Sequence, residues 1–490
     1  MADVQGVALR GYGNLRAARF VLFSIVDRAA TRRWLGSLLE REVITPASPG
    51  KLDRAVNIAF TRSGFEQLGL PKSTLSLFSR EFCEGMSTRE RSSMLGDTGS
   101  SAPASWHWGH PYQSKTDEDS SGRDRQQLDG VLMLYATERG ATVLPERLET
   151  YEAIKELCAI DTLRPDGFEH FGFRDGLVQP HLRNANAPCD VSGVLRPGPD
   201  SNAVNAGEML LGYLDEFGCY EPSPLLSFYD DPRRLLTRGE DGYPDFGKNG
   251  TYLAVRQLQQ DVFAFWKWAA DARFGDPVSL AAKLVGRWPS GAPLTLHPDH
   301  DPGPEAAKEN DFGYSVEDAF GHRCPIGAHT RRANPRDSLE PSDPSFLIGP
   351  KDPFARPTRI ANRHRVIRRG RPYGAHVHPE TLKSMMRGER ATDDGVERGL
   401  LFVAAMASLR RQFEFVQSTW CNDPGFRGLV DEPDPIIAGG VGAEGSSFTV
   451  QAHVPTRLSG IRRFVVVRGG AYFFLPSLRA LRYLAATSAG

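Results

Sequence analysis

The pattern of hydrophobic positions in the first half of the chain predicts alternating strands and helices. The segment 17–26 is rich enough in β-branched and aromatic residues for a buried strand, and 55–61 and 130–137 look like further strands. Helical spacing occurs at 29–39 and 144–160. The polar, Gly- and Ser-rich stretch 96–105 predicts a surface loop. These elements together indicate an α+β fold rather than an all-helical one.

A comparable order of elements occurs in the second half of the chain. The expected strands are 251–255, 366–368, 400–405, 464–467 and 471–474, and the expected helices are 257–268, 409–420 and one that begins at Leu478. Two strand–helix cycles with long insertions predict two α+β halves of related architecture. The join falls in the turn-rich stretch 188–205, so we expect an N-terminal domain over 1–190 and a C-terminal domain over 191–490.

Length and composition fit a globular protein of two domains. The chain has 490 residues, and a single hydrophobic core rarely serves a chain of that size. The formal net charge is −1 with both signs interspersed, which gives no support for a nucleic-acid or membrane-surface partner. The first twenty residues lack the pattern of a secretory signal, and no apolar run approaches the ~20 residues of a membrane span. We therefore expect a cytoplasmic protein.

Cysteine spacing argues against several kinds of site. The six cysteines are scattered without a CxxC pair, which disfavours a zinc ribbon, an iron–sulfur cluster and a disulfide framework.

Three segments carry candidate chemistry, although each has a simpler explanation when taken alone. Asp175 in Phe171–Pro180 fits an ordinary Asp-Gly turn, and His329 in Cys324–Asp337 fits a structural histidine. However, Arg331, Arg332 and Arg336 follow that histidine closely, and guanidinium groups pair well with the carboxylates of a dianionic cofactor. The arginine-rich run that contains Arg368 fits a solvated strand edge.

Taken together, the three segments resemble the dye-decolorising peroxidases, in particular the larger cytoplasmic-type bacterial members. The family's Gly-x-x-Asp-Gly signature matches Gly172–Gly176, and its Ala-His-x-Arg…Asn-Pro-Arg segment matches Ala328–Arg336. Its Arg-x-x-x-Pro-Tyr/Phe-Gly strand matches Arg368–Gly374. The resemblance extends from the N-terminus nearly to the C-terminus.

The resemblance implies a fold of two ferredoxin-like halves, with one haem b in the C-terminal half. It also implies a role for each matching residue. His329 would be the axial iron ligand, Asp175 the distal acid/base and Arg368 the distal arginine. Arg331 would meet a haem propionate, and Leu400 and Phe402 would cover the distal face. The carboxylate partner of His329 would be Asp434 or, as second choice, Glu414.

The implied reaction is the reduction of hydrogen peroxide with oxidation of dyes, phenols or other one-electron donors. A positioned carboxylate can carry a proton from one peroxide oxygen to the other, and an aspartate stays ionised at acid pH, so we expect an acidic optimum. The guanidinium would stabilise the negative charge that develops as the O–O bond breaks. The alternative is a haem carrier that does not turn over peroxide. The sequence leaves the oligomeric state and the physiological donor open.

Overall fold

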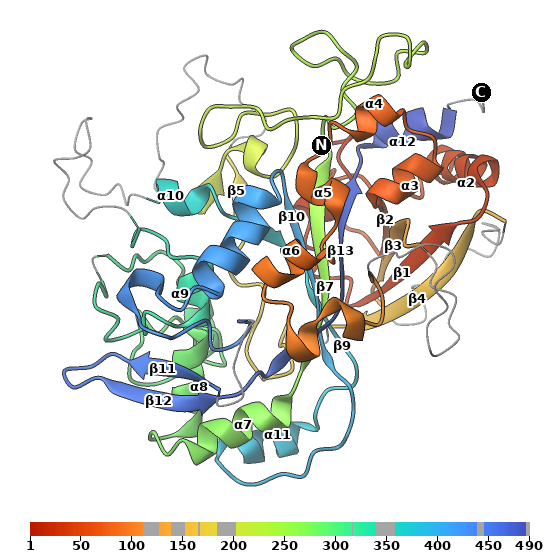
Figure 1. The fold of residues 1–490 in the computed structure, drawn as a ribbon. Helices are drawn as coiled ribbons and strands as arrows, with labels where there is room; N and C mark the ends of the chain where they lie inside the picture. Colours follow the sequence, from red (N-terminus) through yellow and green to blue (C-terminus); the bar gives the residue numbers. More distant parts are fainter. Residues whose placement is uncertain are drawn as a thin grey trace, which may run out of the picture.

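The computed structural model describes residues 1–110, 127–138, 152–164, 167–183, 202–315, 317–339, 358–438 and 445–486. Its centre is a mixed arrangement of helices around one large sheet (Figure 1). The strand order is β7-β13-β2-β3-β1-β4-β9-β10-β8, and β7 also pairs with β10. The sheet therefore closes on itself, and the paired strands run antiparallel throughout.

The first half of the chain contributes four strands in the order of a ferredoxin-like sheet, β2-β3-β1-β4. Helix α2 connects β1 to β2, and several short helices separate β2 from β3. The bounds are α1 Gly6–Leu9, β1 Ala17–Ile25, α2 Arg28–Glu40, β2 Arg54–Phe60, α3 Arg62–Gln67, α4 Lys72–Leu75, α5 Arg80–Glu84, α6 Arg89–Met94, β3 Gly130–Ala136 and β4 Ile154–Leu163.

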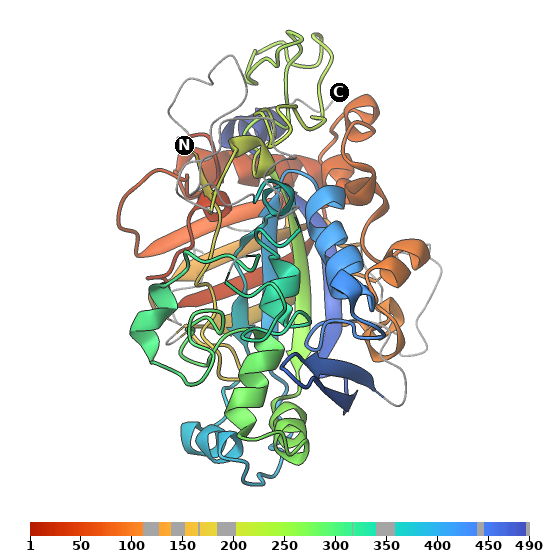
Figure 2. The same cartoon turned by 90° about the vertical axis from the view of Figure 1, so that its left-hand side faces the viewer.

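The second half repeats this order with β13-β7-β10 and the short strands β9 and β8. Its strands run in a clearly different direction from those of the first half in Figure 2. The bounds are β7 Thr251–Gln260, α7 Val262–Asp271, α8 Pro277–Val285, α9 His329–Ala333, α10 Arg359–Asn362, β8 Ile367–Arg368, β9 Arg371–Tyr373, α11 Pro379–Met386, β10 Gly399–Met406, β13 Val465–Leu475 and α12 Leu478–Ala486. Two small pairs, β5 His181–Leu182 with β6 Ala203–Val204 and β11 Ser446–Val450 with β12 Thr456–Ile461, lie outside this sheet.

The expected α+β class with two ferredoxin-like halves is thus confirmed. The expected boundary near residue 190 lies outside the described residues, so the division into 1–190 and 191–490 stays a prediction.

Alternate residues of the central strands pack into two hydrophobic clusters. In β1, Phe20 and Leu22 belong to one cluster, while Val21 and Phe23 belong to the other. The second of these clusters also receives side chains from α2 and α12, which pack against each other. Because side chains alternate along a strand, the two clusters cover opposite faces of the sheet.

Some sequence expectations need correction. The helix expected over 144–160 is wrong where the structure describes it, because Ile154–Leu163 forms β4 and pairs with β1. This segment contains good helix formers, but strand pairing overrides local propensity here.

Two strands of the second half are longer than expected. Strand β7 continues to Gln260, past the expected start of a helix at 257. The two strands expected at 464–467 and 471–474 form the single strand β13, with a bulge between Val467 and Gly469.

The segment expected as a helix over 409–420 is helical but unusual. Arg410–Glu414 and Val416–Cys421 form π-helical turns around Phe415. Such turns are rare and frequently occur at functional sites.

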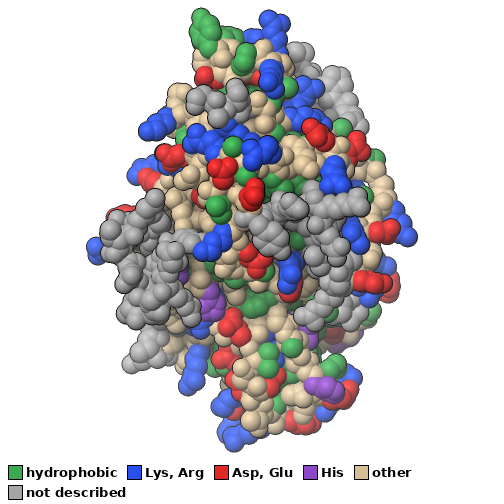
Figure 3. Space-filling view, turned by 90° about the vertical axis from the view of Figure 1, so that its right-hand side faces the viewer, with side chains coloured by type: hydrophobic (Ala, Val, Ile, Leu, Met, Phe, Trp, Pro, Cys, Tyr) green, Lys and Arg blue, Asp and Glu red, His purple; other side chains and the backbone are tan. Residues whose placement is uncertain are grey.

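Acidic and basic side chains are interspersed on the face shown in Figure 3, which agrees with the formal net charge of −1. Among the described residues, no helix has both the length and the apolar character needed to cross a bilayer.

Candidate active site

A cavity of about 330 Å³ brings most of the predicted site residues together. Asp175, Arg368, His329, Leu400 and Phe402 all line it. They come from the loop before β5, from β8, from α9 and from β10. The remaining wall is largely apolar and includes Val285, Phe312, Ile436 and Ile437. A mostly apolar cavity with a few convergent polar groups is the usual form of a cofactor or substrate site.

The loop that carries Asp175 is fixed by the partly buried carboxylate of Glu169. Gly172 and Gly176 have φ values of 93° and 76°, a region that favours glycine and lets the loop turn sharply on both sides of Asp175. Glu169 accepts hydrogen bonds from the backbone N–H groups of Phe171 (2.9 Å) and Phe173 (2.8 Å).

Glu169 is partly buried in the wall of the larger cavity, and its pKa is shifted. Gln260 Nε2 also donates to its carboxylate, at 2.6 Å. Burial raises the pKa of Glu169 to about 7, and the charge of Asp175 adds to this effect, although the three hydrogen bonds oppose it.

Asp175 and Arg368 form a loose pair, with 3.9 Å between Asp175 Oδ1 and Arg368 Nη1. The side chain of Asp175 is 27% exposed and that of Arg368 is 40% exposed, so both are accessible from the cavity. The backbone N–H of Arg368 donates to Gln179 Oε1 at 2.9 Å, and β8 is paired with β10 through Arg368 and Ala404. The backbone at Arg368 is therefore held from both sides, while its guanidinium can still contact a small molecule beside Asp175.

His329 is oriented by a buried carboxylate. It begins α9, and its Nδ1 donates to Asp434 Oδ2 at 2.9 Å. The other oxygen of Asp434 accepts from the backbone N–H groups of Ile436 (2.9 Å) and Ile437 (3.0 Å). Burial alone would raise the pKa of Asp434, but His329 and Arg332 outweigh it and lower the pKa below its usual value. With Nδ1 engaged in this way, Nε2 is the nitrogen left for a metal.

Between the two carboxylates considered for His329, the structure places Asp434 beside it and Glu414 elsewhere. Glu414 accepts from Arg91 Nη1 at 2.7 Å and from the Tyr472 hydroxyl at 2.6 Å.

Arg331 does not line the cavity. Its side chain is fully buried, pairs with Asp318 Oδ2 at 3.0 Å and lies over the Tyr314 ring at 4.4 Å. Arg336 does line the cavity, and its Nη1 donates to the backbone oxygens of Asn310 and Phe312. Of the arginines that follow His329, the structure therefore brings Arg336 rather than Arg331 to the cavity.

Sequence reasoning missed a second polar part of the cavity wall. Asp97 and Arg256 form a buried ion pair and line the cavity together with Gly96 and Ser101. The stretch 96–105, expected as a surface loop, is exposed at 98–100 and 104–105, but its buried Asp97 and Ser101 line the cavity. Its Gly- and Ser-rich composition resembles that of ordinary loops, and the partner Arg256 lies far away in sequence, so no local signal marks this role. Glu169, by contrast, lies next to a recognised motif and could have been singled out.

Proteins of known identity with similar sequences cover nearly the whole chain. Peroxidase 2 of Mycetinis scorodonius is 30% identical over 98% of this chain and 87% of its own length. The dye-decolorizing peroxidase of Exidia glandulosa is 29% identical over 98% and 86%. A crystal structure of a decolorizing peroxidase from Auricularia auricula-judae has a TM-score of 0.73 at 28% identity and covers 99% of both chains. No family model matches the chain.

The chain belongs to the dye-decolorising peroxidase family. It is accordingly an oxidoreductase that uses peroxide. The sequence resemblance singled out larger bacterial members, whereas the similar proteins just named are fungal. A bacterial relative, the multifunctional dye peroxidase of Amycolatopsis, is 29% identical over 74% of this chain.

Dye-decolorising peroxidases are haem enzymes, and the residues of the cavity fit such a group. An imidazole with one nitrogen tied to a carboxylate suits iron ligation. Apolar side chains suit the faces of a porphyrin. Arg336 supplies a cation for the carboxylate edge of a porphyrin.

Proposed function

We propose that this chain is a haem b peroxidase that reduces hydrogen peroxide and oxidises dyes, phenols or other one-electron donors. The observation that carries the proposal is that Asp175, Arg368 and His329 line one cavity while Asp434 fixes the ring of His329. A haem carrier needs an axial histidine, but it has no use for the accessible Asp–Arg pair.

Asp175 is proposed as the proton carrier. Its carboxylate accepts a proton from one oxygen of hydrogen peroxide and returns it to the other oxygen, which leaves as water. The loop geometry supports this role, because Gly172 and Gly176 permit the turn and Glu169 holds the preceding N–H groups. The side chain therefore enters the cavity from a fixed backbone.

Arg368 is proposed to stabilise the negative charge on the departing oxygen. A guanidinium stays charged over the whole working pH range and offers several donors. The 3.9 Å gap to Asp175 leaves both groups free to contact the same small molecule. Donors placed where charge develops typically contribute about 10²–10³ in rate.

His329 is proposed as the residue that would bind the haem iron, with Asp434 as its hydrogen-bond partner. Bound haem would supply the two electrons that reduce hydrogen peroxide, and donors would replace them one at a time. The buried Asp434 holds the proton on Nδ1 and makes the imidazole a stronger electron donor. We propose Arg336, in place of Arg331, as the arginine for a propionate, and Leu400 and Phe402 as apolar cover for the ring.

The absorption spectrum of the purified protein tests this proposal. A Soret band that shifts rapidly on addition of stoichiometric peroxide, followed by oxidation of an added dye, is the expected result. Tight haem binding without such a shift would favour the carrier. Replacement of His329 by Ala should loosen or abolish haem binding, whereas His297→Ala, at an exposed pair with Glu309, serves as the control.

A further inference from the structure

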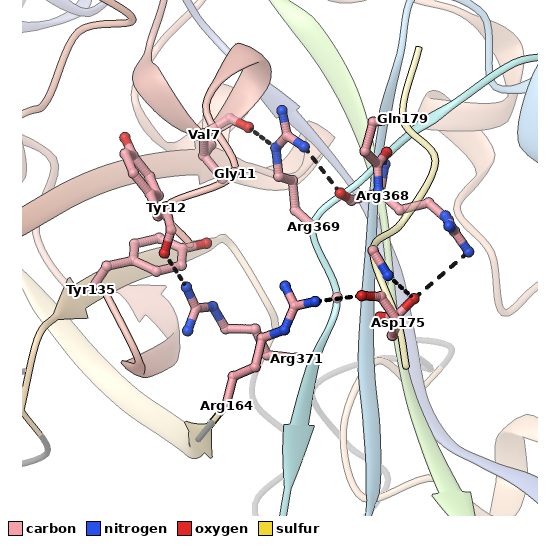
Figure 4. Close-up of a pocket in the computed structure, with 12 residues that line it drawn as sticks. Val7, Gly11, Tyr12, Tyr135, Arg164, Asp175, Gln179, Arg368, Arg369 and Arg371 are labelled. Carbon is pink, nitrogen blue, oxygen red and sulfur yellow. Dashed lines mark hydrogen bonds and ion pairs between the residues drawn. The ribbon is translucent and has the colours of Figure 1, made fainter. Parts of the chain in front are cut away.

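A second, smaller cavity lies beside Asp175, and we call it the arginine cavity (Figure 4). It measures about 80 Å³ and shares Asp175, Gly176 and Arg368 with the larger cavity. Its wall combines the N-terminal segment, the end of β3 and the turn between β8 and β9. The lining residues used below are Tyr12, Tyr135, Arg164, Asp175, Arg369 and Arg371.

The lining of this cavity carries far more positive than negative charge. Arg164, Arg368, Arg369 and Arg371 line it, and Asp175 is the one carboxylate among its lining residues. Arg164 and Arg368 approach Asp175 from opposite sides in Figure 4. Arg164 Nη2 donates to the backbone oxygen of Asp175, at 2.7 Å. This hydrogen bond does not neutralise the charge of the Asp175 carboxylate.

Arg369 and Arg371 hydrogen-bond to neutral groups. Arg369 donates to the backbone oxygens of Val7 (2.8 Å) and Arg368 (3.1 Å), and Arg371 donates to those of Arg16 and Tyr12 (both 3.1 Å). Burial lowers the pKa of each to about 10, and the side chains that oppose this effect are tyrosines rather than acids. Both arginines are therefore still cationic at neutral pH.

A buried hydroxyl without a partner lies in the same wall. Tyr135 is 3% exposed, and its hydroxyl has no hydrogen-bond partner in the described structure. The hydroxyl points toward the arginine side chains in Figure 4. Burial raises the pKa of Tyr135 to about 12, so the group keeps its proton and can donate it. The neighbouring Tyr12 hydroxyl is already used, since it donates to Asn57 Oδ1 at 3.0 Å.

The buried cation of Arg371 and the buried Tyr135 hydroxyl without an acceptor are both costly, and one ligand would satisfy both. We propose that the arginine cavity binds a small monoanion of the nitrate, formate or halide class. The anion accepts from the Tyr135 hydroxyl and lies against the guanidinium of Arg371.

The size of the cavity limits the ligand. About 80 Å³ holds a few water-sized groups, which admits a nitrate ion and excludes a sulfonated dye or an aromatic sulfonate.

Because the arginine cavity adjoins Asp175 and Arg368, a bound anion should also affect the reaction with peroxide. This effect rests on the proposed function. An anion in the arginine cavity repels the ionised Asp175 and competes with it for Arg368. Nitrate should therefore slow the reaction with peroxide. Binding itself does not depend on peroxide turnover, so it can be measured separately.

The test measures the thermal unfolding midpoint of the purified protein as the nitrate concentration rises. Nitrate replaces benzenesulfonate in the buffer, so the ionic strength stays constant. A ligand of the folded state raises the midpoint in a saturable manner. We expect nitrate to do so. The variant Tyr135→Phe should weaken the apparent affinity about tenfold, because it removes one hydrogen bond to a charged group. It leaves the ring beside Arg371, whose guanidinium lies 5.0 Å from its centre.

The matched control is Tyr252→Phe, which removes another buried tyrosine hydroxyl. That hydroxyl accepts a hydrogen bond from the backbone N–H of Ser79 at 3.0 Å, and Tyr252 lines neither cavity. It should keep the affinity of the unaltered protein. Bromide in crystals should give an anomalous peak beside Tyr135. Equal stabilisation by nitrate and benzenesulfonate, or an affinity unchanged by Tyr135→Phe, would overturn the anion site. Peroxidase failure with intact nitrate binding would instead count against the proposed function alone.

Discussion

Replacing Glu169 with Gln should change how stability depends on pH. Glu169 is partly buried in the loop that carries Asp175, and its removal from solvent there raises its pKa from 4.5 to about 7. For an acid with a raised pKa, the folded state holds the proton more tightly than the unfolded state. Stability therefore falls as pH rises from 4.5 towards 7 and stays level above that range. A glutamine does not titrate and lacks this contribution.

The size of the effect follows from the two pKa values. A difference of roughly 2.5 units corresponds to about 3 kcal/mol in full, of which about 2–3 kcal/mol falls between pH 5 and pH 8. With roughly 2 cal/mol/K of unfolding entropy per residue, a chain of this length loses about 2–3 °C in unfolding midpoint. The hydrogen bond that glutamine fails to make to Phe171 or Phe173 lowers stability at both pH values, so it cancels in the comparison between them.

The assay is the thermal midpoint of the unaltered protein and of Glu169→Gln at pH 5 and pH 8. At each pH, the midpoint of the variant is subtracted from that of the unaltered protein. This difference should be about 2–3 °C smaller at pH 8 than at pH 5. Glu66→Gln, at an exposed i,i+4 pair with Arg62, is the control and should follow the unaltered protein. If Glu169→Gln and the unaltered protein show the same pH dependence, Glu169 does not titrate as burial implies.

Further outcomes concern the residues proposed to hold the haem. Asp434→Asn should lower the free energy of unfolding by about 1–3 kcal/mol, because the amide oxygen can still accept from His329 Nδ1–H but replaces a charged acceptor with a neutral one, and a urea titration checks this. Its haem reduction potential should rise, as measured by redox titration; an unchanged potential would contradict the pairing. Arg336→Leu should weaken haem affinity in a transfer assay, while Arg331→Leu should mainly lower stability through its buried pair with Asp318. The opposite pattern would restore Arg331 as the propionate partner.

Much of the fold follows from local patterns in the sequence. The strands β1, β2, β3 and β10 were predicted within one or two residues, because each is a short, largely apolar run of strand length. Strand β4 was not predicted, because its sequence contains good helix formers and its strand conformation depends on pairing with the distant strand β1. Closure of the sheet through β7 and β10 is likewise a long-range contact that periodicity does not report.

The site was predictable to the extent that motifs carry it. The matching motifs led to Asp175, His329 and Arg368, which line one cavity. The choice between Arg331 and Arg336 was not predictable, because it depends on where α9 ends and on how the chain turns after it. Arg336 has a φ of 52°, and this turn sets the direction of its side chain. Asp97 and Arg256 are too far apart in sequence for any local signal.

The central claim is that Asp175 and Arg368 act together on peroxide in a cavity where His329 holds the haem. The most direct measurement is the bimolecular rate constant for the reaction of the haem-loaded protein with hydrogen peroxide, followed by stopped-flow absorption. Asp175→Asn and Arg368→Leu should each keep the Soret band and lower the rate constant by about 10²–10³. Rate constants equal to that of the unaltered protein in both variants would contradict the account.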